Sequence, residues 1–168
     1  MRTPFHHPLE PRFVAPGEHP LRDEALAAVN RDLAATLPDQ PPLCLVACPG
    51  EPEDEEPERV HVALADGSTH GNFLQPASSA ADALHIVAEA AQETVMECLW
   101  LAWPVCALHG LGTHLTLDAG RSSWWCGGTD GPDGPGHLHA AVGETDRVRP
   151  PRRPNREPRA DGTAHGRR

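Results

Sequence analysis

The sequence predicts an α+β protein: a helix, a three-stranded antiparallel sheet, a long helix and a β-hairpin module, with disordered termini. Two segments carry apolar residues at helical spacing, and short apolar or alternating segments between turn sequences predict strands. Proline is frequent at both ends, and arginine in the last segment. We therefore expect four parts: a flexible arm over 1–18, an α+β domain over 19–102, a hairpin module over 103–146 docked on it, and a disordered Arg/Pro-rich tail over 147–168.

Both predicted helices have a start signal and a stop signal. The first begins near Pro20, which suits a first helical turn, and ends before Pro38. Its apolar stripe consists of Leu26, Val29, Leu33 and Leu37. The second begins after a capping sequence at Ser79 and runs to about Ala102, ahead of Pro104. Its stripe consists of Leu84, Val87, Ala91, Val95, Cys98 and Ala102.

Strands are predicted on either side of the second helix. The apolar run 43–48 predicts a buried strand, and the alternation over 60–64 predicts a second one. Asp66-Gly67 is a hairpin signal that leads to a third short strand around 70–74. In the hairpin module, the expected strands are 114–117, 122–125 and 137–142.

Composition indicates a bacterial protein of a reducing compartment. Arginine supplies all 14 basic side chains, and with abundant Ala, Pro and Gly this bias is typical of a high-G+C bacterial genome. The first residues lack the apolar segment of a secretion signal, and no run of 18 apolar residues exists. The five cysteines are therefore expected to be thiols or metal ligands, and the protein to be cytoplasmic without membrane contact.

Charge is divided unevenly along the chain. Residues 1–146 hold 22 acidic side chains and 6 arginines, a net charge of −16. Residues 147–168 hold 8 arginines and 2 acidic side chains, a net charge of +6. Most of the surface should repel nucleic acid, so any contact with phosphate would have to come through the tail.

One group of residues has the chemistry of a metal site. Two residues separate Cys106 from His109, and Gly110 follows, a spacing at which a tight turn directs both donors at one ion. Cys126 follows after 16 further residues, room for a hairpin that returns the chain to the metal, and His137 after 10 more. Two thiolates and two imidazoles suit tetrahedral Zn²⁺ better than Mg²⁺ or Ca²⁺.

This pattern resembles the zinc-ribbon family, with a first knuckle, a β-hairpin and a second pair of ligands over about 103–142. The resemblance implies a structural zinc and a small three-stranded fold. The ligand positions fall on Cys106, His109, Cys126 and His137. A ribbon's second knuckle has two intervening residues, whereas ten separate Cys126 from His137, so His139 and His114 remain alternatives for the fourth ligand. The alternative to a metal site is that the cysteines are small buried apolar residues.

Other patterns predict no catalytic site. Glu89, Glu93 and Glu97 share one face of the second helix, and we expect them to form a solvated surface. Cys44 and Cys48 share one face of a strand and are expected to pack in the core, as is Cys98. The chain lacks the H-x-E sequence of zinc deaminases, a G-x-S-x-G sequence, a P-loop and a dinucleotide fingerprint.

The function expected from the sequence is a non-catalytic interaction or regulatory protein stabilised by structural zinc. A protein partner is expected, with the acidic loop 51–58 and one exposed residue of the pair Trp124 and Trp125 as candidate contacts. One alternative is a nucleic-acid-binding zinc-ribbon protein that uses its Arg-rich tail. Another is a zinc-dependent hydrolase, which would require water in place of one of the four ligands.

Overall fold

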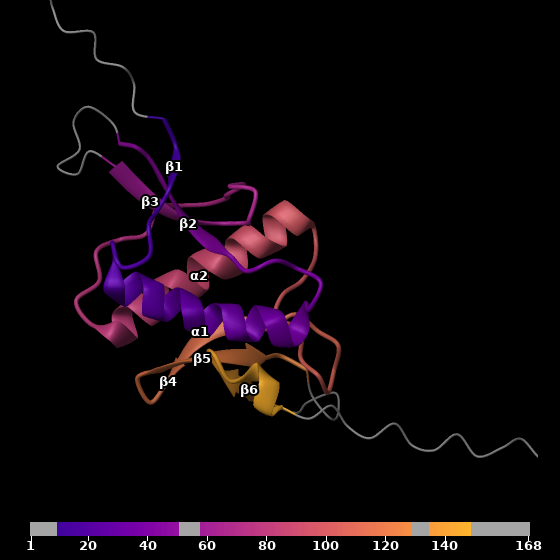
Figure 1. Ribbon diagram of the computed structural model, residues 1–168. Helices are drawn as coiled ribbons and strands as arrows, with labels where there is room; N and C mark the ends of the chain where they lie inside the picture. Colours follow the sequence, from indigo (N-terminus) through magenta and orange to yellow (C-terminus); the bar gives the residue numbers. More distant parts are fainter. Residues whose placement is uncertain (1–9, 51–57, 129–134, 149–168) are drawn as a thin grey trace, which may run out of the picture.

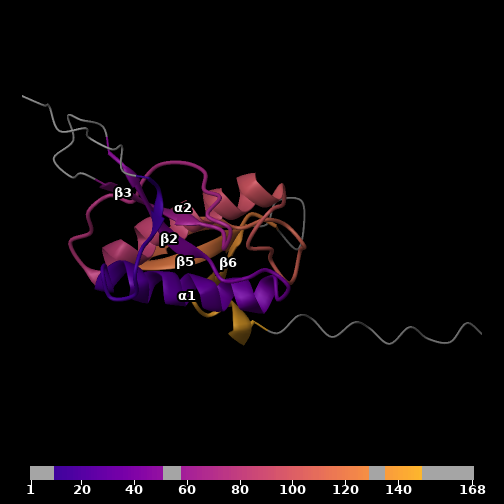
Figure 2. The same cartoon turned by 45° about the horizontal axis from the view of Figure 1, so that its top comes forward.

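The computed structural model describes residues 10–50, 58–128 and 135–148 and confirms the α+β class. Two helices lie between two three-stranded antiparallel sheets (Figures 1 and 2). The elements are β1 (Arg12–Phe13), α1 (Pro20–Thr36), β2 (Cys44–Pro49), β3 (Glu58–Ala63), α2 (Ala80–Leu99), β4 (His114–Asp118), β5 (Arg121–Cys126), β6 (His137–Ala141) and a 3₁₀ turn η1 (Thr145–Arg147). Several predicted segments lie outside the described residues: 1–9 of the arm, 51–57 of the acidic loop, 129–134 of the glycine-rich loop and 149–168 of the tail.

The first sheet has the order β1-β2-β3, so one of its three strands differs from the prediction. The prediction of a strand at 70–74 is wrong. Asp66-Gly67 does turn the chain, with the Gly67 N–H donating to the Leu64 carbonyl, but the returning segment contains Gly71 and Asn72, which favour strands poorly. It follows β3 as an irregular segment, in which the Leu74 N–H donates to the Val60 carbonyl at 2.7 Å.

The missing edge strand comes from β1, within the segment that the sequence assigns to the flexible arm. Arg12 pairs with Ala47 and Phe13 with Val46 of β2. The Arg12 guanidinium also bridges two carboxylates, at 2.6 Å from Glu18 and 2.6 Å from Glu58, the first residue of β3. Residues 12–18 are therefore tied to the sheet.

The Arg12 pair predicts an acidic titration for Glu18. Hydrogen bonds from the Arg12 guanidinium and, less strongly, from the Ala15 N–H lower the pKa of Glu18 from about 4.5 to about 2. Because the folded-state pKa is lowered, the pairing stabilises the fold above pH 4.5, and this contribution is lost as the pH falls towards 2. We expect NMR titration of the Glu18 side chain to show this value and Arg12→Gln to move it back towards 4.5. Since both side chains are exposed, the effect on stability should be small; an unchanged Glu18 titration in the variant would contradict the pairing.

Both helices begin where the sequence predicts. Pro20 occupies the first turn of α1, and the Ser79 hydroxyl accepts a hydrogen bond from the Asp82 N–H at 3.1 Å at the start of α2. The second helix ends at Leu99, three residues earlier than predicted, because Trp100 takes a left-handed conformation with φ 55°. Among the described residues, no helix has the length and apolar character needed to cross a membrane.

A pair of tryptophans joins the second sheet, β4-β5-β6, to the helices. Trp103 and Trp124 are buried and meet edge to face, with ring centroids 5.6 Å apart. The Trp103 indole N–H donates to the Thr36 hydroxyl at 2.8 Å, and the Trp124 indole N–H donates to the Asp32 carboxylate at 2.8 Å. Both rings belong to the same core as the apolar faces of α1 and α2. The prediction that one of Trp124 and Trp125 is buried and the other exposed is confirmed.

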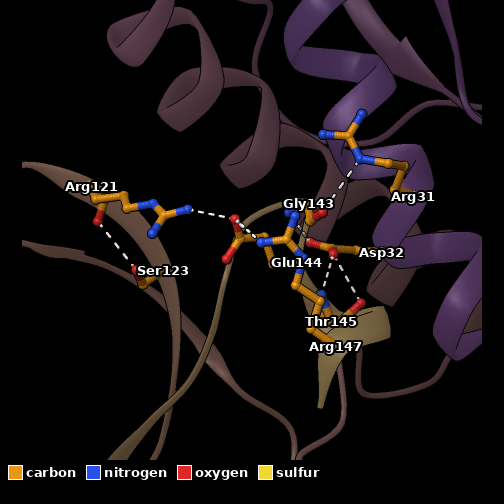
Figure 3. Close-up of polar contacts among 8 residues, drawn as sticks. All are labelled: Arg31, Asp32, Arg121, Ser123, Gly143, Glu144, Thr145 and Arg147. Atoms are coloured by element: carbon orange, nitrogen blue, oxygen red, sulfur yellow. Dashed lines mark hydrogen bonds and ion pairs between the residues drawn. The ribbon is translucent and has the colours of Figure 1, made fainter.

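The buried carboxylate of Asp32 connects α1 to the second sheet through hydrogen bonds. Its side chain is fully buried in α1 and points at the chain that follows β6 (Figure 3). Besides the bond from Trp124, it accepts hydrogen bonds from the Gly143 N–H at 2.7 Å and from the N–H and hydroxyl of Thr145, both at 2.9 Å. These four donors hold the segment after β6 against α1. At the surface beside it, Glu144 accepts from Arg121 at 2.7 Å and from Arg147 at 2.9 Å (Figure 3).

Candidate metal centre

The first two candidate ligands lie on a tight loop between α2 and β4. Val105 and Gly112 form an isolated antiparallel bridge that closes the loop at its base. Within it, the Cys106 N–H donates to the Leu111 carbonyl, and the Gly110 N–H donates to the Cys106 carbonyl, both at 2.8 Å. Gly110 has a φ of +67°, as expected for the residue after a metal knuckle. The turn brings the side chains of Cys106 and His109 to the same point, with 3.8 Å between Sγ and Nδ1.

The other two candidate ligands lie opposite each other on adjacent strands. Cys126 ends β5 and His137 begins β6, and the two residues are paired in the antiparallel register. Directly opposed residues point to the same face of a sheet, with Cβ atoms about 4.5–5.5 Å apart. This register lets two side chains that are distant in sequence reach one ion.

The four side chains form one compact group. Their ligand atoms, two Sγ and two imidazole nitrogens, all lie within 4.8 Å of one another. The Cys126 Sγ is 3.5 Å from His109 Nδ1, and the Cys106 Sγ is 3.5 Å from His137 Nε2. A tetrahedral zinc ion with Zn–S of about 2.3 Å and Zn–N of about 2.0–2.1 Å would place sulfur and nitrogen about 3.6 Å apart. The group is therefore close enough to hold a metal ion, at separations that suit a tetrahedral one.

The surroundings of Cys126 favour its neutral thiol as long as no cation is present. Cys106 and Cys126 are buried, whereas His109 and His137 are partly exposed. Burial raises the pKa of the Cys126 thiol, and the neighbouring Cys106 raises it further, while a hydrogen bond from the Gly128 N–H to Sγ at 3.3 Å lowers it. A divalent cation reverses this preference, because it binds the thiolate form.

The two alternative histidines do not join the group. His139 lies two residues beyond His137 on β6, about 7 Å further along the strand, too far to share an ion held near the end of β5. His114 is exposed on β4 beside α2. Among the described residues, the only group with three or more metal-binding side chains at this distance is that of Cys106, His109, Cys126 and His137.

The remaining thiols lie elsewhere. Cys44 and Cys48 are on β2, where the Cys44 thiol donates to the Leu64 carbonyl at 3.2 Å, and Cys98 is near the end of α2. Burial raises the pKa of the Cys44 and Cys98 thiols. All three are half-buried rather than fully buried, and none belongs to the four-residue group.

Gly128 contributes to the centre in a way that the sequence analysis missed. Its N–H contacts the Cys126 sulfur, and a Cβ at this position would lie 2.5 Å from Cγ of the His109 ring. The backbone can therefore approach both ligands only because residue 128 lacks a side chain. The available signal was a glycine two residues after a candidate ligand cysteine.

Replacing Gly128 by alanine is expected to weaken metal binding. The new methyl group would displace the His109 ring and with it the Gly128 N–H, and loss of such outer contacts typically lowers metal affinity about 10–100-fold. The matched control is Gly127→Ala, whose Cβ would meet the Trp125 ring at 3.3 Å and no candidate ligand. Competition with a zinc-selective chelator measures the zinc affinity of both variants. Equal affinities would show that the close contact of the Gly128 backbone with Cys126 and His109 does not contribute to metal binding.

We compared the chain with known protein families, curated proteins and solved structures. No protein-family model, no curated protein and no solved structure matches this chain. The functional argument therefore rests on the geometry of the four-residue group and of the surface around it.

Proposed function

We propose that this protein is a non-catalytic interaction or regulatory protein in which one structural Zn²⁺ ion holds a zinc-ribbon-like hairpin module. The observation that carries the proposal is the convergence of two thiols and two imidazoles, with all four ligand atoms within 4.8 Å. They come from three places in the chain: the loop after α2, the end of β5 and the start of β6. An ion bound there would link these segments directly.

The donor set supports zinc rather than a hard cation. Thiolate sulfur and imidazole nitrogen are the ligands of tetrahedral structural zinc, whereas Mg²⁺ and Ca²⁺ take oxygen ligands. The S···N separations of 3.5, 3.5 and 3.8 Å are close to those of a tetrahedral ion. If the two cysteines served only as small buried side chains, their sulfurs would have no reason to lie this close to two imidazole nitrogens.

The number of donors supports a structural rather than a catalytic role. Catalytic zinc keeps one position open for water or substrate, whereas four protein ligands fill a tetrahedral ion. Both sulfurs are buried, so solvent could approach only from the side of the two imidazoles. A hydrolase would need one of the four residues to leave the ion.

The surface around the centre supports a role in protein interaction. The ligand-bearing loop exposes Val105, Leu108 and Leu111, and the adjacent strands expose Trp125 and Leu138. Exposed apolar side chains that lie close together in a folded protein are typical of a contact surface for another protein. In this proposal the metal ion holds the side chains of Cys106 and His109 in place, and the loop that carries them contacts the partner protein.

Metal content tests the first half of the proposal. Native mass spectrometry of the purified protein should show one zinc ion per chain, removable by a chelator. Replacement by Co²⁺ should give the visible absorption of a tetrahedral site and near-ultraviolet bands from thiolate ligands. A spectrum of six-coordinate Co²⁺ without thiolate bands, or a folded protein that takes up no metal, would exclude the site.

The contact surface is tested separately. The double variant Leu108→Ser, Leu111→Ser should retain its zinc and lose proteins that co-purify with the wild-type chain from its own cells. The matched control, Leu21→Ser, changes an exposed leucine on α1 far along the chain from the centre. If both variants retain the same co-purifying proteins, the loop is not the contact surface.

A further inference from the structure

The edges of the two sheets are formed by β1, β3, β4 and β6, and three of these strands carry a feature that hinders further pairing. β1 has only two residues. The segment after β3 folds back on it, with the Thr69 hydroxyl donating to the Val62 carbonyl at 2.6 Å. β6 pairs with β5 through a register shift at Trp124 and Trp125. Short edge strands, covering segments and bulges are the means by which natural proteins prevent unwanted pairing.

β4 has none of these features. Its five residues, His114–Asp118, pair with β5 without a register shift and include no lysine or proline. Within the described ranges, no strand pairs with the side of β4 that faces away from β5. Hydrogen-bonded positions alternate along an antiparallel pair, so β4 presents N–H and C=O groups to this side at every second residue. The strand lies at the lower margin of the ribbon in Figure 1. This edge can therefore accept another strand.

The core ends unevenly at this edge. Leu115 lies opposite Trp124 and packs against the core from the helix-facing side of the sheet. Leu117 belongs to the same face of β4 because side chains alternate along a strand, yet it is 59% exposed. A further strand beside β4 would cover Leu117 and extend the apolar layer.

The sequence of β4 is complementary to itself. If two antiparallel copies are aligned at Thr116, each residue of the strand has a partner: His114 lies opposite Asp118, Leu115 opposite Leu117, and Thr116 opposite Thr116. Pairs of opposite charge, apolar pairs and threonine pairs all stabilise neighbouring strands. This is the only register in which all five residues of both copies are paired.

We propose that two copies of this chain associate through β4, about a two-fold axis at Thr116, so that their second sheets form one continuous sheet. On the helix-facing side, Leu115 and Leu117 of both copies meet. On the other side, the two threonines lie at the axis between two pairs of His114 and Asp118. The contact is isologous and small, so the dimer should form reversibly as the concentration rises. The inference does not depend on the metal centre.

A charge placed at the two-fold axis tests the proposal. Sedimentation velocity of the full chain gives the concentration of half-dimerisation. An ionic strength of about 0.15 M screens charges beyond about 8 Å and so limits repulsion between chains of net charge −10. Thr116→Lys opposes two ammonium groups and Thr116→Glu two carboxylates, so each variant should need about tenfold or more the wild-type concentration. An equimolar mixture of the two variants opposes lysine to glutamate and should dimerise as readily as the wild type.

The matched control is Ala34→Lys, which makes the same change of net charge at an exposed position of α1. This variant should dimerise like the wild type, and circular dichroism should show the same fold in all the proteins. A wild-type chain that stays monomeric throughout the concentration series would overturn the proposal. Thr116 variants that dimerise like the wild type, or that lose association without recovering it in the mixture, would overturn it as well. Equal weakening in the Ala34 variant would attribute the effect to overall charge and would also overturn it.

Discussion

Replacing Cys106 by serine is expected to remove the bound zinc and to lower the melting temperature by about 8–16 °C. When free zinc is about 1,000 times its dissociation constant, binding stabilises the folded state by about 4 kcal/mol. For a chain of this size, each kcal/mol corresponds to about 2–4 °C in Tm. Serine cannot supply the soft sulfur donor, so the variant should melt at the same temperature with and without a chelator. Thermal unfolding followed by circular dichroism measures the difference.

The control for this prediction is another cysteine of the same chain. Cys48→Ser changes a half-buried thiol on β2 that does not belong to the metal group. This variant should keep both its zinc and its response to the chelator. A wild-type protein whose Tm is unchanged by chelation would contradict the prediction, and so would equal losses of zinc in the two serine variants.

Replacing Asp32 by asparagine is expected to destabilise the fold by about 2–5 kcal/mol. The carboxylate accepts four hydrogen bonds in a fully buried position. An amide keeps one accepting oxygen and turns its NH₂ group towards two of the four donors, which then lack an acceptor. Each buried polar group without a partner costs about 1–3 kcal/mol. Urea denaturation of the two proteins gives the difference in the free energy of unfolding.

Asp39→Asn is the matched control, because it makes the same change at an exposed position just after α1. Its stability should stay within about 0.5 kcal/mol of the wild type. An Asp32→Asn protein as stable as this control would show that the four hydrogen bonds contribute little. The m-value should be the same in all three proteins, since the surface exposed on unfolding does not change.

The elements that the sequence predicts correctly are those determined by neighbouring residues. Pro20 and Ser79 start the two helices, and the central residues of the apolar stripes are buried: Leu26, Val29 and Leu33 in α1, and Val87, Ala91 and Val95 in α2. The last stripe residues, Leu37 and Ala102, lie beyond the helix ends, and Ala102 is exposed. The hairpin of β4 and β5 is also predicted, since strands and turn follow one another directly. For the candidate centre, the short spacing of Cys106 and His109 with Gly110 was sufficient to name the first two residues. The register between β5 and β6, which only the structure gives, brings in His137 and leaves out His139.

The features that the sequence does not predict depend on contacts between distant segments. Arg12–Phe13 is too short to show a strand pattern, and it becomes a strand only because β2 offers a free edge. Asp32 has the appearance of an ordinary polar residue of an amphipathic helix, and its burial is explained only by the donors that arrive more than 100 residues later. The cavity beside Glu89 and Glu93 of α2 likewise has its second wall from residues after the helix, among them Trp103 and Thr113.

The two buried tryptophans have a consequence for the order of assembly. Trp103 lies three residues before Cys106, and Trp124 lies two residues before Cys126. Each indole is hydrogen-bonded to α1, so packing of the helices already brings both sulfurs into position. In the proposed metal centre, we therefore expect the ion to bind last, to strands and a loop that are already packed on the helices. Metal exchange should accordingly proceed while the helices stay folded, and a cell short of zinc would hold a folded apoprotein that can be loaded later.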